Sequence, residues 1–188
     1  MEKYSRIKAL ISLDAIRYNF EQMKKNIKEG TKIIAVIKAD AYGHGAVPIA
    51  RMLEEFDYIW GFAAATAQEA LQLRKAGITR PILILGLVFE EYYKKLAEND
   101  VRMAVCDYET ARKFNKAAEA AGKKGLIHLA ADTGMTRIGF KDSEESLEEI
   151  RRIAALPNVE IEGLFTHFAR ADEYDLSLIH ISEPTRLL

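Results

Sequence analysis

Six short apolar runs recur along the chain and constrain its fold more than any other feature. They are rich in Val, Ile and Leu, and they lie at 32–37, 58–64, 82–86, 102–106, 126–131 and 161–166. Each has the length of a strand, and near-continuous apolarity is typical of strands that are covered on both faces. Helical patterns separate the runs at a spacing of roughly 20 to 35 residues. The alternation predicts repeated βαβ units and a parallel sheet.

Helix-terminating signals support this alternation. In the stretch 14–29 the spacing of the apolar residues predicts one buried stripe, formed by Ile16, Phe20, Met23 and Ile27. Gly30 is a stop signal for that helix. The remaining signals are Thr66 with Glu69 as a capping box, Gly77 and Gly122 as helix ends, Asp107 as an N-cap, and Asp142 or Ser143 as another.

Either a doubly wound sheet or a (β/α) barrel fits the pattern, and the position of the unusual residues favours the barrel. Polar or glycine residues follow most of the runs: Lys38, Gly86, Asp107, the stretch 132–137 and His167. In a barrel all of these positions lie on the carboxyl rim, where active sites are built. We predict an α/β fold of the (β/α)8 TIM-type barrel, truncated to about six βα units, since a complete barrel needs about 250 residues.

Composition excludes several classes of partner. The 188 residues include 27 basic and 28 acidic ones, so the net charge of -1 creates no general attraction to nucleic acid or to an acidic membrane. Cys106 is the single cysteine and cannot form an intrachain disulfide. The sequence shows neither a signal peptide nor an apolar stretch long enough to span a bilayer. We expect a cytoplasmic protein whose partner is a small molecule.

Lys38 stands at the end of the first run, in "AVIKADAYGHGA". A partly desolvated amine at such a position has a lowered pKa and can form a Schiff base with a carbonyl compound. The alternative is a lysine whose long side chain reaches solvent. The two glycines that follow allow close backbone approach to a ligand, and the nearby tyrosine and histidine supply polar groups around it.

Two further clusters could carry chemistry. "DTGMTRIGF" at 132–140 offers Arg137, which could bind a carboxylate or phosphate, although a solvated arginine on a tight turn fits equally well. "FTHFARADE" at 165–173 offers His167, which could stack on a ring, transfer a proton or serve a structural role. The histidines show no metal-ligand spacing, so we predict no metal site. No P-loop, GxGxxG fingerprint or GxSxG elbow is present.

Taken together, the three motifs resemble those of the alanine racemases, the fold-type III enzymes that use pyridoxal 5′-phosphate, from about residue 5 to about residue 175. The resemblance implies that Lys38 holds the cofactor covalently and is the base specific for the D-amino acid. It also implies that Tyr42 contacts the cofactor phosphate, that Arg137 lies near the cofactor hydroxyl and the substrate carboxylate, and that His167 packs on the cofactor ring. Leu85 matches a leucine that lines the pocket.

The resemblance further implies racemisation of L- and D-alanine for peptidoglycan in a homodimer, with a tyrosine from the partner's C-terminal β-domain as the second base. That domain and that tyrosine have no counterpart in this sequence. Many members carry a carbamylated lysine that orients the arginine, whereas Ala130 occupies this place here. The alternatives are a racemase for serine, lysine or arginine, and a non-catalytic pyridoxal-phosphate-binding barrel.

The last residues depart from the family pattern. We expect 1–175 to be an incomplete alanine-racemase-like barrel portion and 176–188, "LSLIHISEPTRLL", to be a non-family tail that resembles translated adapter sequence. A fragment of this kind, without the C-terminal β-domain, would be inactive alone. Later strands would cover its open edges and the apolar surface beside them.

Overall fold

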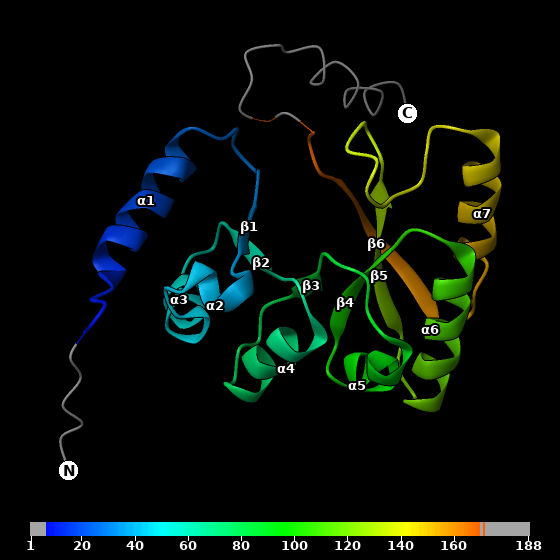
Figure 1. Cartoon of the computed structure of the whole chain (residues 1–188), viewed down its shortest axis with the longest axis horizontal. Helices are drawn as coiled ribbons and strands as arrows, with labels where there is room; N and C mark the ends of the chain where they lie inside the picture. Colours follow the sequence, from blue (N-terminus) through cyan, green and yellow to red (C-terminus); the bar gives the residue numbers. More distant parts are fainter. Residues whose placement is uncertain (1–6, 170, 172–188) are drawn as a thin grey trace.

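Six parallel strands form one sheet in the computed structural model, which describes residues 7–169 and 171 (Figure 1). The order of the strands in space is their order in the sequence. Their bounds are β1 Ile33–Val36, β2 Ile59–Ala64, β3 Ile82–Ile84, β4 Val101–Val105, β5 Gly125–Ala131 and β6 Val159–Thr166. Each strand overlaps one of the six predicted apolar runs, so the parallel α/β sheet is confirmed.

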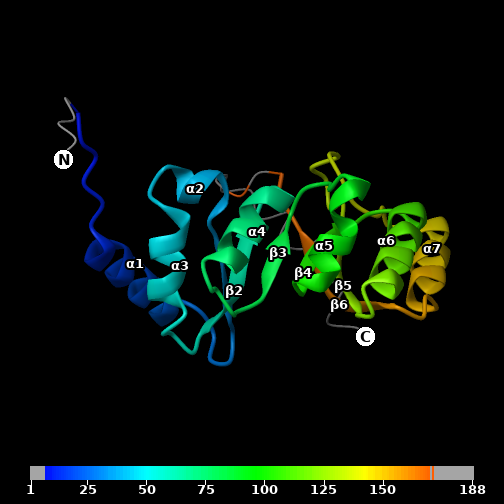
Figure 2. The same ribbon diagram turned by 90° about the horizontal axis from the view of Figure 1, so that it is seen from below.

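The strand order decides between the two architectures that the sequence left open. A doubly wound sheet reverses its strand order at a switch point, whereas a barrel adds each strand beside the last. Here β1 to β6 follow one another without reversal, and the sheet curls with its helices along the outer side (Figures 1 and 2). The prediction of a TIM-type barrel truncated to six βα units is confirmed.

In the described part of the chain, four helices fall where the sequence predicts them and three short ones have no predicted counterpart. Their bounds are α1 Leu13–Lys25, α2 Lys38–Tyr42, α3 Ala46–Leu53, α4 Ala67–Lys75, α5 Tyr93–Glu98, α6 Tyr108–Ala120 and α7 Glu144–Ala154, with a 3-10 turn η1 at Glu90–Tyr92. The Thr66–Glu69 capping box and the Asp107 cap are both formed. Of the two candidates for the cap of α7, Ser143 takes the position and accepts a hydrogen bond from the Ser146 N–H.

The first helix differs from its prediction. It ends at Lys25, because Asn26 caps it: the Asn26 backbone N–H donates to the Met23 carbonyl and its side chain donates to the Gln22 carbonyl. The predicted stripe is only partly covered. Ile16 and Phe20 pack against the core, while Met23 is 43% exposed. Helix α1 lies at the β1 edge of the sheet, where few elements surround it (Figure 1).

The main core lies between the sheet and its helices. Phe62, Met103 and Ile127 from the strands are fully buried there against Leu53 and Phe114 from the helices. The opposite face of the sheet lines the barrel interior. On β1 that face is open, since Ile34 and Val36 are 37% and 43% exposed. Leu164 of β6 pairs in register with Leu129 of the main core, so it lies on the helix side of the sheet, where it is 59% exposed. No helix in the described part of the chain is long and apolar enough to cross a membrane.

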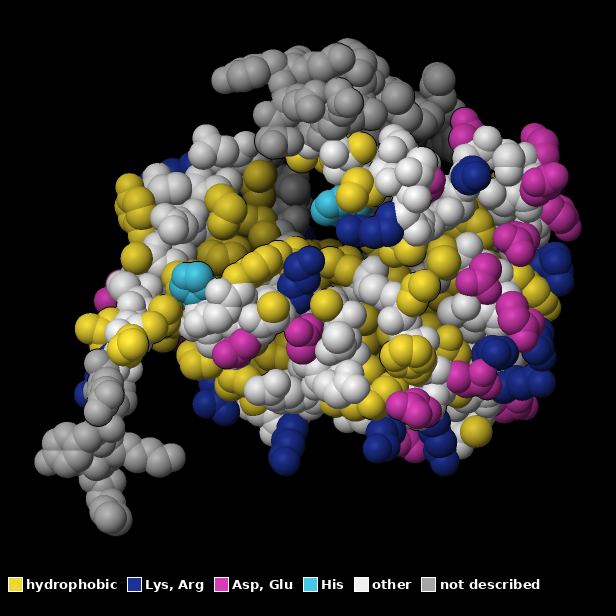
Figure 3. Space-filling view, in the orientation of Figure 1, with side chains coloured by type: hydrophobic (Ala, Val, Ile, Leu, Met, Phe, Trp, Pro, Cys, Tyr) yellow, Lys and Arg dark blue, Asp and Glu magenta, His cyan; other side chains and the backbone are white. Residues whose placement is uncertain are grey.

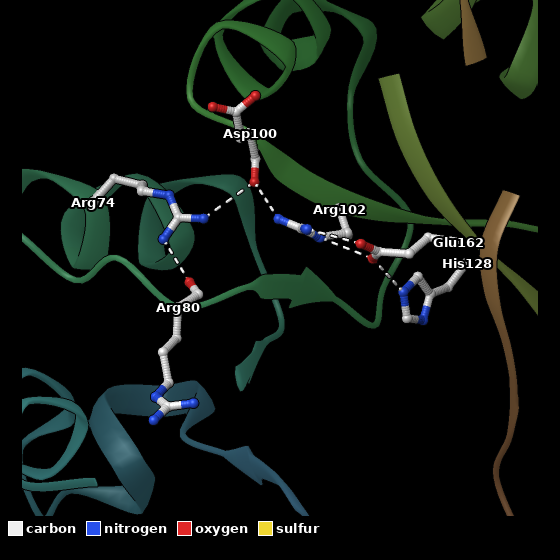
Figure 4. A network of polar contacts seen from close by, with 6 residues as sticks. All are labelled: Arg74, Arg80, Asp100, Arg102, His128 and Glu162. Atoms are coloured by element: carbon white, nitrogen blue, oxygen red, sulfur yellow. Dashed lines mark hydrogen bonds and ion pairs between the residues drawn. The ribbon is translucent and has the colours of Figure 1, made fainter. Parts of the chain in front are cut away.

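Polar side chains brace the amino end of the sheet (Figure 4). Arg74 donates to the carbonyls of Arg80 and Asp100, and Arg102 also donates to the Asp100 carbonyl. The Arg102 guanidinium makes two hydrogen bonds, of 2.9 and 2.8 Å, to the carboxylate of Glu162. These contacts connect the β2–β3 and β3–β4 connections to β6. The guanidinium groups of Arg74 and Arg102 thus donate to acceptors within the protein.

His128 completes this network inside the barrel. Its Nε2 lies 3.0 Å from Glu162 Oε2, and because a carboxylate only accepts, Nε2 donates. The ring also lies against Trp60, with centroids 5.5 Å apart. Hydrogen bonds from Arg102 first, and then from His128, lower the pKa of Glu162 despite its partial burial. The carboxylate therefore stays ionised at neutral pH.

We expect Glu162→Gln to lower the free energy of unfolding by roughly 2 kcal/mol at neutral pH, because hydrogen bonds to a charged group are lost. A group whose pKa is lowered in the folded state contributes stability above its unfolded pKa, and that contribution disappears as the pH falls through the folded value. The difference between wild type and variant should therefore shrink in acid. Urea unfolding at several pH values measures it. Glu148→Gln, in an exposed pair with Arg151, is the matched control and should change stability by less than about 0.5 kcal/mol.

Candidate functional site

The carboxyl ends of the strands surround a pocket of about 340 Å³. All five residues that the sequence predicted for the site line it: Lys38, Tyr42, Leu85, Arg137 and His167. They come from connections that follow β1, β3, β5 and β6, up to 129 positions apart in the sequence. Figure 3 shows a hollow on this side of the molecule, with His and Lys or Arg side chains beside it and apolar side chains below.

The pocket walls are apolar, and sequence reasoning missed most of them. They include Ile34, Val36, Ala63, Leu83 and Phe165. Alternation within a strand was the available signal, because residues two apart share one face of the sheet. Leu83 pairs in register with Arg102, so the same inner face carries the pocket near its carboxyl end and the charged network towards its amino end. The pocket and the charged network therefore occupy opposite ends of the barrel interior.

Lys38 begins an unusual backbone segment. The next four residues, Ala39 to Tyr42, have φ of 51° to 55°, so α2 is a left-handed turn instead of an ordinary helix. Residues other than glycine rarely adopt this conformation, which costs about 1–2 kcal/mol each. The turn places Tyr42 beside Lys38, with the ammonium 6.0 Å from the centre of the phenol ring. Both side chains consequently reach one pocket.

Hydrogen bonds hold the left-handed turn at several points. Asp40 Oδ1 accepts from the Ala46 N–H at 2.7 Å and so connects the turn to the first residue of α3. His44 Nδ1 lies 3.0 Å from the Ala41 carbonyl. Glu69 Oε1 accepts from the Ala39 N–H at 2.9 Å. The polar residues after Lys38 in the first motif therefore serve largely to fold the segment that carries the lysine.

The second motif forms a closed loop after β5. Its two ends meet in backbone hydrogen bonds from Asp132 N–H to the Phe140 carbonyl and from Phe140 N–H to the Ala130 carbonyl. The Asp132 carboxylate accepts from the N–H groups of Thr136 and Gly134, which lower its pKa. Asp132 thus folds the loop from within.

Two further contacts fix the orientation of the loop. Thr133 Oγ1 lies 2.7 Å from Thr166 Oγ1, which joins the loop to the last residue of β6, directly before His167. Gly139 has φ of 126°, and a Cβ there would lie 2.6 Å from the Asp132 nitrogen. Only glycine fits this position. The loop therefore reaches the pocket in one arrangement.

Arg137 is exposed and lines the pocket, and in the described part of the chain its guanidinium has no hydrogen-bond or ion-pair partner. Ala130 is 2% exposed and lines the same pocket. A methyl side chain cannot accept a hydrogen bond, so it leaves the arginine donors available. The planar donor set of an arginine suits a carboxylate or a phosphate.

Other chemistry finds less support. Cys106 is half-buried, and burial together with the neighbouring Asp107 raises the pKa of its thiol, which disfavours the thiolate. No group of three or more His, Cys, Asp or Glu within the described residues could hold a metal ion. The pocket instead joins an amine, a phenol, an imidazole and a guanidinium over apolar walls. Such a set can bind a flat anionic ligand and react with its carbonyl group.

Comparison with known proteins gives the relationship. The family model of the alanine racemase N-terminal domain matches residues 11–181. Alanine racemase from Methanococcus maripaludis is 43% identical over 89% of this chain, and the chain spans 44% of that relative. Alanine racemase from Clostridium tetani is 44% identical, again over 89% of this chain and 43% of the relative. The chain thus spans less than half the length of these relatives.

Solved structures agree with the sequence comparison. Alanine racemase from Clostridium difficile superimposes with a TM-score of 0.87 and 43% identity, over 91% of this chain and 45% of that one. Histidine racemase from Leuconostoc mesenteroides superimposes with a TM-score of 0.80 and 30% identity, also over 91% and 45%. With a family match that spans nearly all the described residues and the same curled sheet, the chain belongs to the alanine racemase N-terminal domain family.

Proposed function

We propose that the pocket binds pyridoxal 5′-phosphate and that the complete protein interconverts L- and D-alanine. The observation that carries the proposal is the convergence of Lys38, Tyr42, Arg137 and His167 on one pocket. The membership of this chain in the alanine racemase N-terminal domain family supports the same reaction. The racemase relatives extend well beyond this chain, so the proposal concerns the complete protein.

The residues present fit the cofactor. A primary amine suits an aldehyde, apolar walls suit the faces of an aromatic ring, and the Tyr42 hydroxyl, on a side chain that is 61% exposed, can donate to a phosphate oxygen. The His167 imidazole can pack on the ring, and Arg137, whose guanidinium has no partner among the described residues, can bind a carboxylate. When bound, the cofactor supplies an electron-withdrawing ring that acidifies the Cα–H of an amino acid attached to it.

Lys38 then has two functions. Its amine would hold the cofactor, and the free amine would take a proton from the substrate Cα or return one there. Racemisation removes the Cα proton from one face and returns a proton to the other, so a second base must face Lys38 across the substrate. By resemblance to the family we assign Lys38 to the D-specific face. We assign the second base to a tyrosine from a C-terminal domain of the partner in a homodimer.

Alanine is the proposed substrate because the alanine racemase from Clostridium difficile is 43% identical to this chain, whereas the histidine racemase is 30% identical. The histidine racemase nonetheless has the same fold over this region, so the fold alone does not select a side chain. A racemase for serine, lysine or arginine and a non-catalytic cofactor carrier are therefore the alternatives. Supply of D-alanine for peptidoglycan is the proposed role, with the cytoplasm as its location.

The decisive experiment joins this chain to the coding sequence that follows residue 175 in its source DNA. Purified protein from that longer gene should convert L-alanine to D-alanine, measured by chiral chromatography with serine, lysine, arginine and histidine as competing substrates. Binding of the cofactor without conversion of any amino acid would favour the carrier. Preference for another amino acid would replace alanine as the substrate.

Lys38→Ala should abolish covalent attachment of pyridoxal 5′-phosphate, because among the described residues Lys38 is the one lysine that lines the pocket. Attachment is measured by borohydride reduction followed by mass spectrometry of the peptides. Lys32→Ala is the matched control, since its ammonium donates to the Asp57 carbonyl away from the pocket, and its adduct should persist. Equal adduct yields in both variants would contradict the assignment of Lys38.

Arg137→Gln should raise the KM for the amino acid roughly 10- to 100-fold, since a hydrogen-bonded charge that binds the carboxylate is removed. Steady-state kinetics of the complete protein measures this change. Arg151→Gln, which alters an exposed arginine on α7, is the control and should leave KM unchanged. An unaltered KM in Arg137→Gln would remove the arginine from carboxylate binding.

Gly139→Ala should lower the free energy of unfolding by roughly 3 kcal/mol, because the new Cβ meets backbone atoms and the left-handed φ adds strain. Gly77→Ala is the control: its φ is also positive, at 87°, but a Cβ there meets nothing within 4 Å. This variant should lose only about 1 kcal/mol. Urea unfolding compares the two, and equal losses would mean that the loop is free to adjust.

A further inference from the structure

We propose that Glu69 is a positioning residue for Lys38, in addition to its function in starting α4. The proposal rests on the proposed function, since it concerns the amine that would hold the cofactor. Glu69 lies 31 positions from Lys38 in the sequence, outside all three motifs and outside the set of residues that line the pocket. Its assigned function in the sequence was the capping box alone.

The Glu69 carboxylate binds two segments at once. Oε2 accepts from the N–H groups of Ala65 and Thr66, at 2.8 and 3.3 Å, which completes the capping box of α4. Oε1 points to another connection and accepts from the Ala39 N–H at 2.9 Å. Ala39 is the residue directly after Lys38. One side chain therefore joins the start of α4 to the backbone that carries the amine.

The contact falls where the backbone needs support. Ala39 is the first of four consecutive residues in the left-handed region, each of which costs about 1–2 kcal/mol to hold there. A hydrogen bond from a backbone N–H to a carboxylate is among the stronger ones in proteins. At the other end of the turn, the Asp40 carboxylate accepts from Ala46. Glu69 thus holds the end from which the Lys38 side chain departs.

Loss of the hydrogen bond between Glu69 and Ala39 should change the geometry of the pocket, because the left-handed turn positions two pocket residues. Lys38 stands at the start of the turn and Tyr42 at its end, and both line the pocket. If Ala39 relaxes towards an ordinary helical or extended φ, the direction of both side chains changes. A capping residue with no other function would alter only the stability of α4.

A glutamine at position 69 separates the two functions. Its amide keeps one oxygen, which can accept from Ala65 and Thr66, while its NH₂ group would face the Ala39 N–H, donor against donor. Glu69→Gln therefore preserves the capping box and removes the contact to Ala39. The variant should fold.

Glu54 offers a matched control. It too accepts two backbone N–H groups from another connection, those of Thr79 at 2.7 Å and Arg80 at 3.0 Å, but it lies before β2 and β3, at the opposite end of the sheet from the pocket. Glu54→Gln makes the same chemical change to a carboxylate that braces a loop. Any loss of stability that it shares with Glu69→Gln is structural.

The test titrates wild type, Glu69→Gln and Glu54→Gln with pyridoxal 5′-phosphate, in the complete protein used for the racemase assay. The Lys38 amine condenses with the aldehyde and releases water, borohydride reduces the product to a stable secondary amine, and mass spectrometry measures the modified Lys38 peptide. Glu69→Gln should raise the cofactor concentration for half-maximal modification about tenfold. Glu54→Gln should leave that concentration unchanged.

A second substitution tests the mechanism by rescue. Glycine adopts a positive φ without the steric cost, so Ala39→Gly in the Glu69→Gln background should restore most of the lost modification although the capping residue is still glutamine. Equal effects of Glu69→Gln and Glu54→Gln on modification would overturn the proposal, as would an absence of rescue.

Failure of the proposed function gives a different result. If wild-type Lys38 is not modified by the cofactor at all, the assignment of pyridoxal 5′-phosphate is wrong. The positioning by Glu69 is then measured by competitive acetylation of the protein with acetic anhydride. Acetylation of Lys38 should be faster in Glu69→Gln than in wild type. Adding Ala39→Gly to Glu69→Gln should return it to the wild-type rate, and the rate at Lys32 should be the same in every variant. No change at Lys38 would overturn the positioning.

Discussion

The hydrogen-bonded ladder that joins each strand to its neighbour in the sequence is the constraint on which the pocket depends. Because every pair is parallel, all six carboxyl ends lie at one edge, and each following connection begins there. The lysine after β1, the arginine loop after β5 and the histidine after β6 therefore meet, although no local contact joins them along the chain. The curl of the sheet turns that edge into a rim around a pocket with apolar walls.

Much of this fold is readable from the sequence because its signals are local. Continuous apolarity marked the six strands, and side chains such as Thr66 and Asp107 marked helix starts through bonds within one turn. The prediction failed where distant contacts decide. Helices α2, α3 and α5 are short, and Pro48 within the first turn of α3 hides the helical pattern there. The left-handed turn depends on partners as far along the chain as Glu69.

The site shows the same division. Residue types at strand ends pointed to Lys38, Arg137 and His167, and the structure brings these together. The residues of the pocket walls could not be predicted from the sequence, because they depend on which face of each strand turns towards the barrel interior. That Arg137 has no partner within the part of the chain that the structure describes depends on the whole local arrangement. Ala130 was visible in the sequence, but its burial in the wall of the same pocket that Arg137 lines depends on the fold.

The charged network of Arg74, Arg102, Glu162 and His128 lies towards the amino ends of the strands, away from the pocket. This separation has an evolutionary consequence. Groups that brace the scaffold are distinct from groups that face a ligand, so rim loops can diversify without loosening the strand array. A family with this layout can acquire new specificities by drift and selection at the rim. The alanine racemase from Clostridium difficile and the histidine racemase from Leuconostoc mesenteroides both superimpose on this half of the molecule, with TM-scores of 0.87 and 0.80.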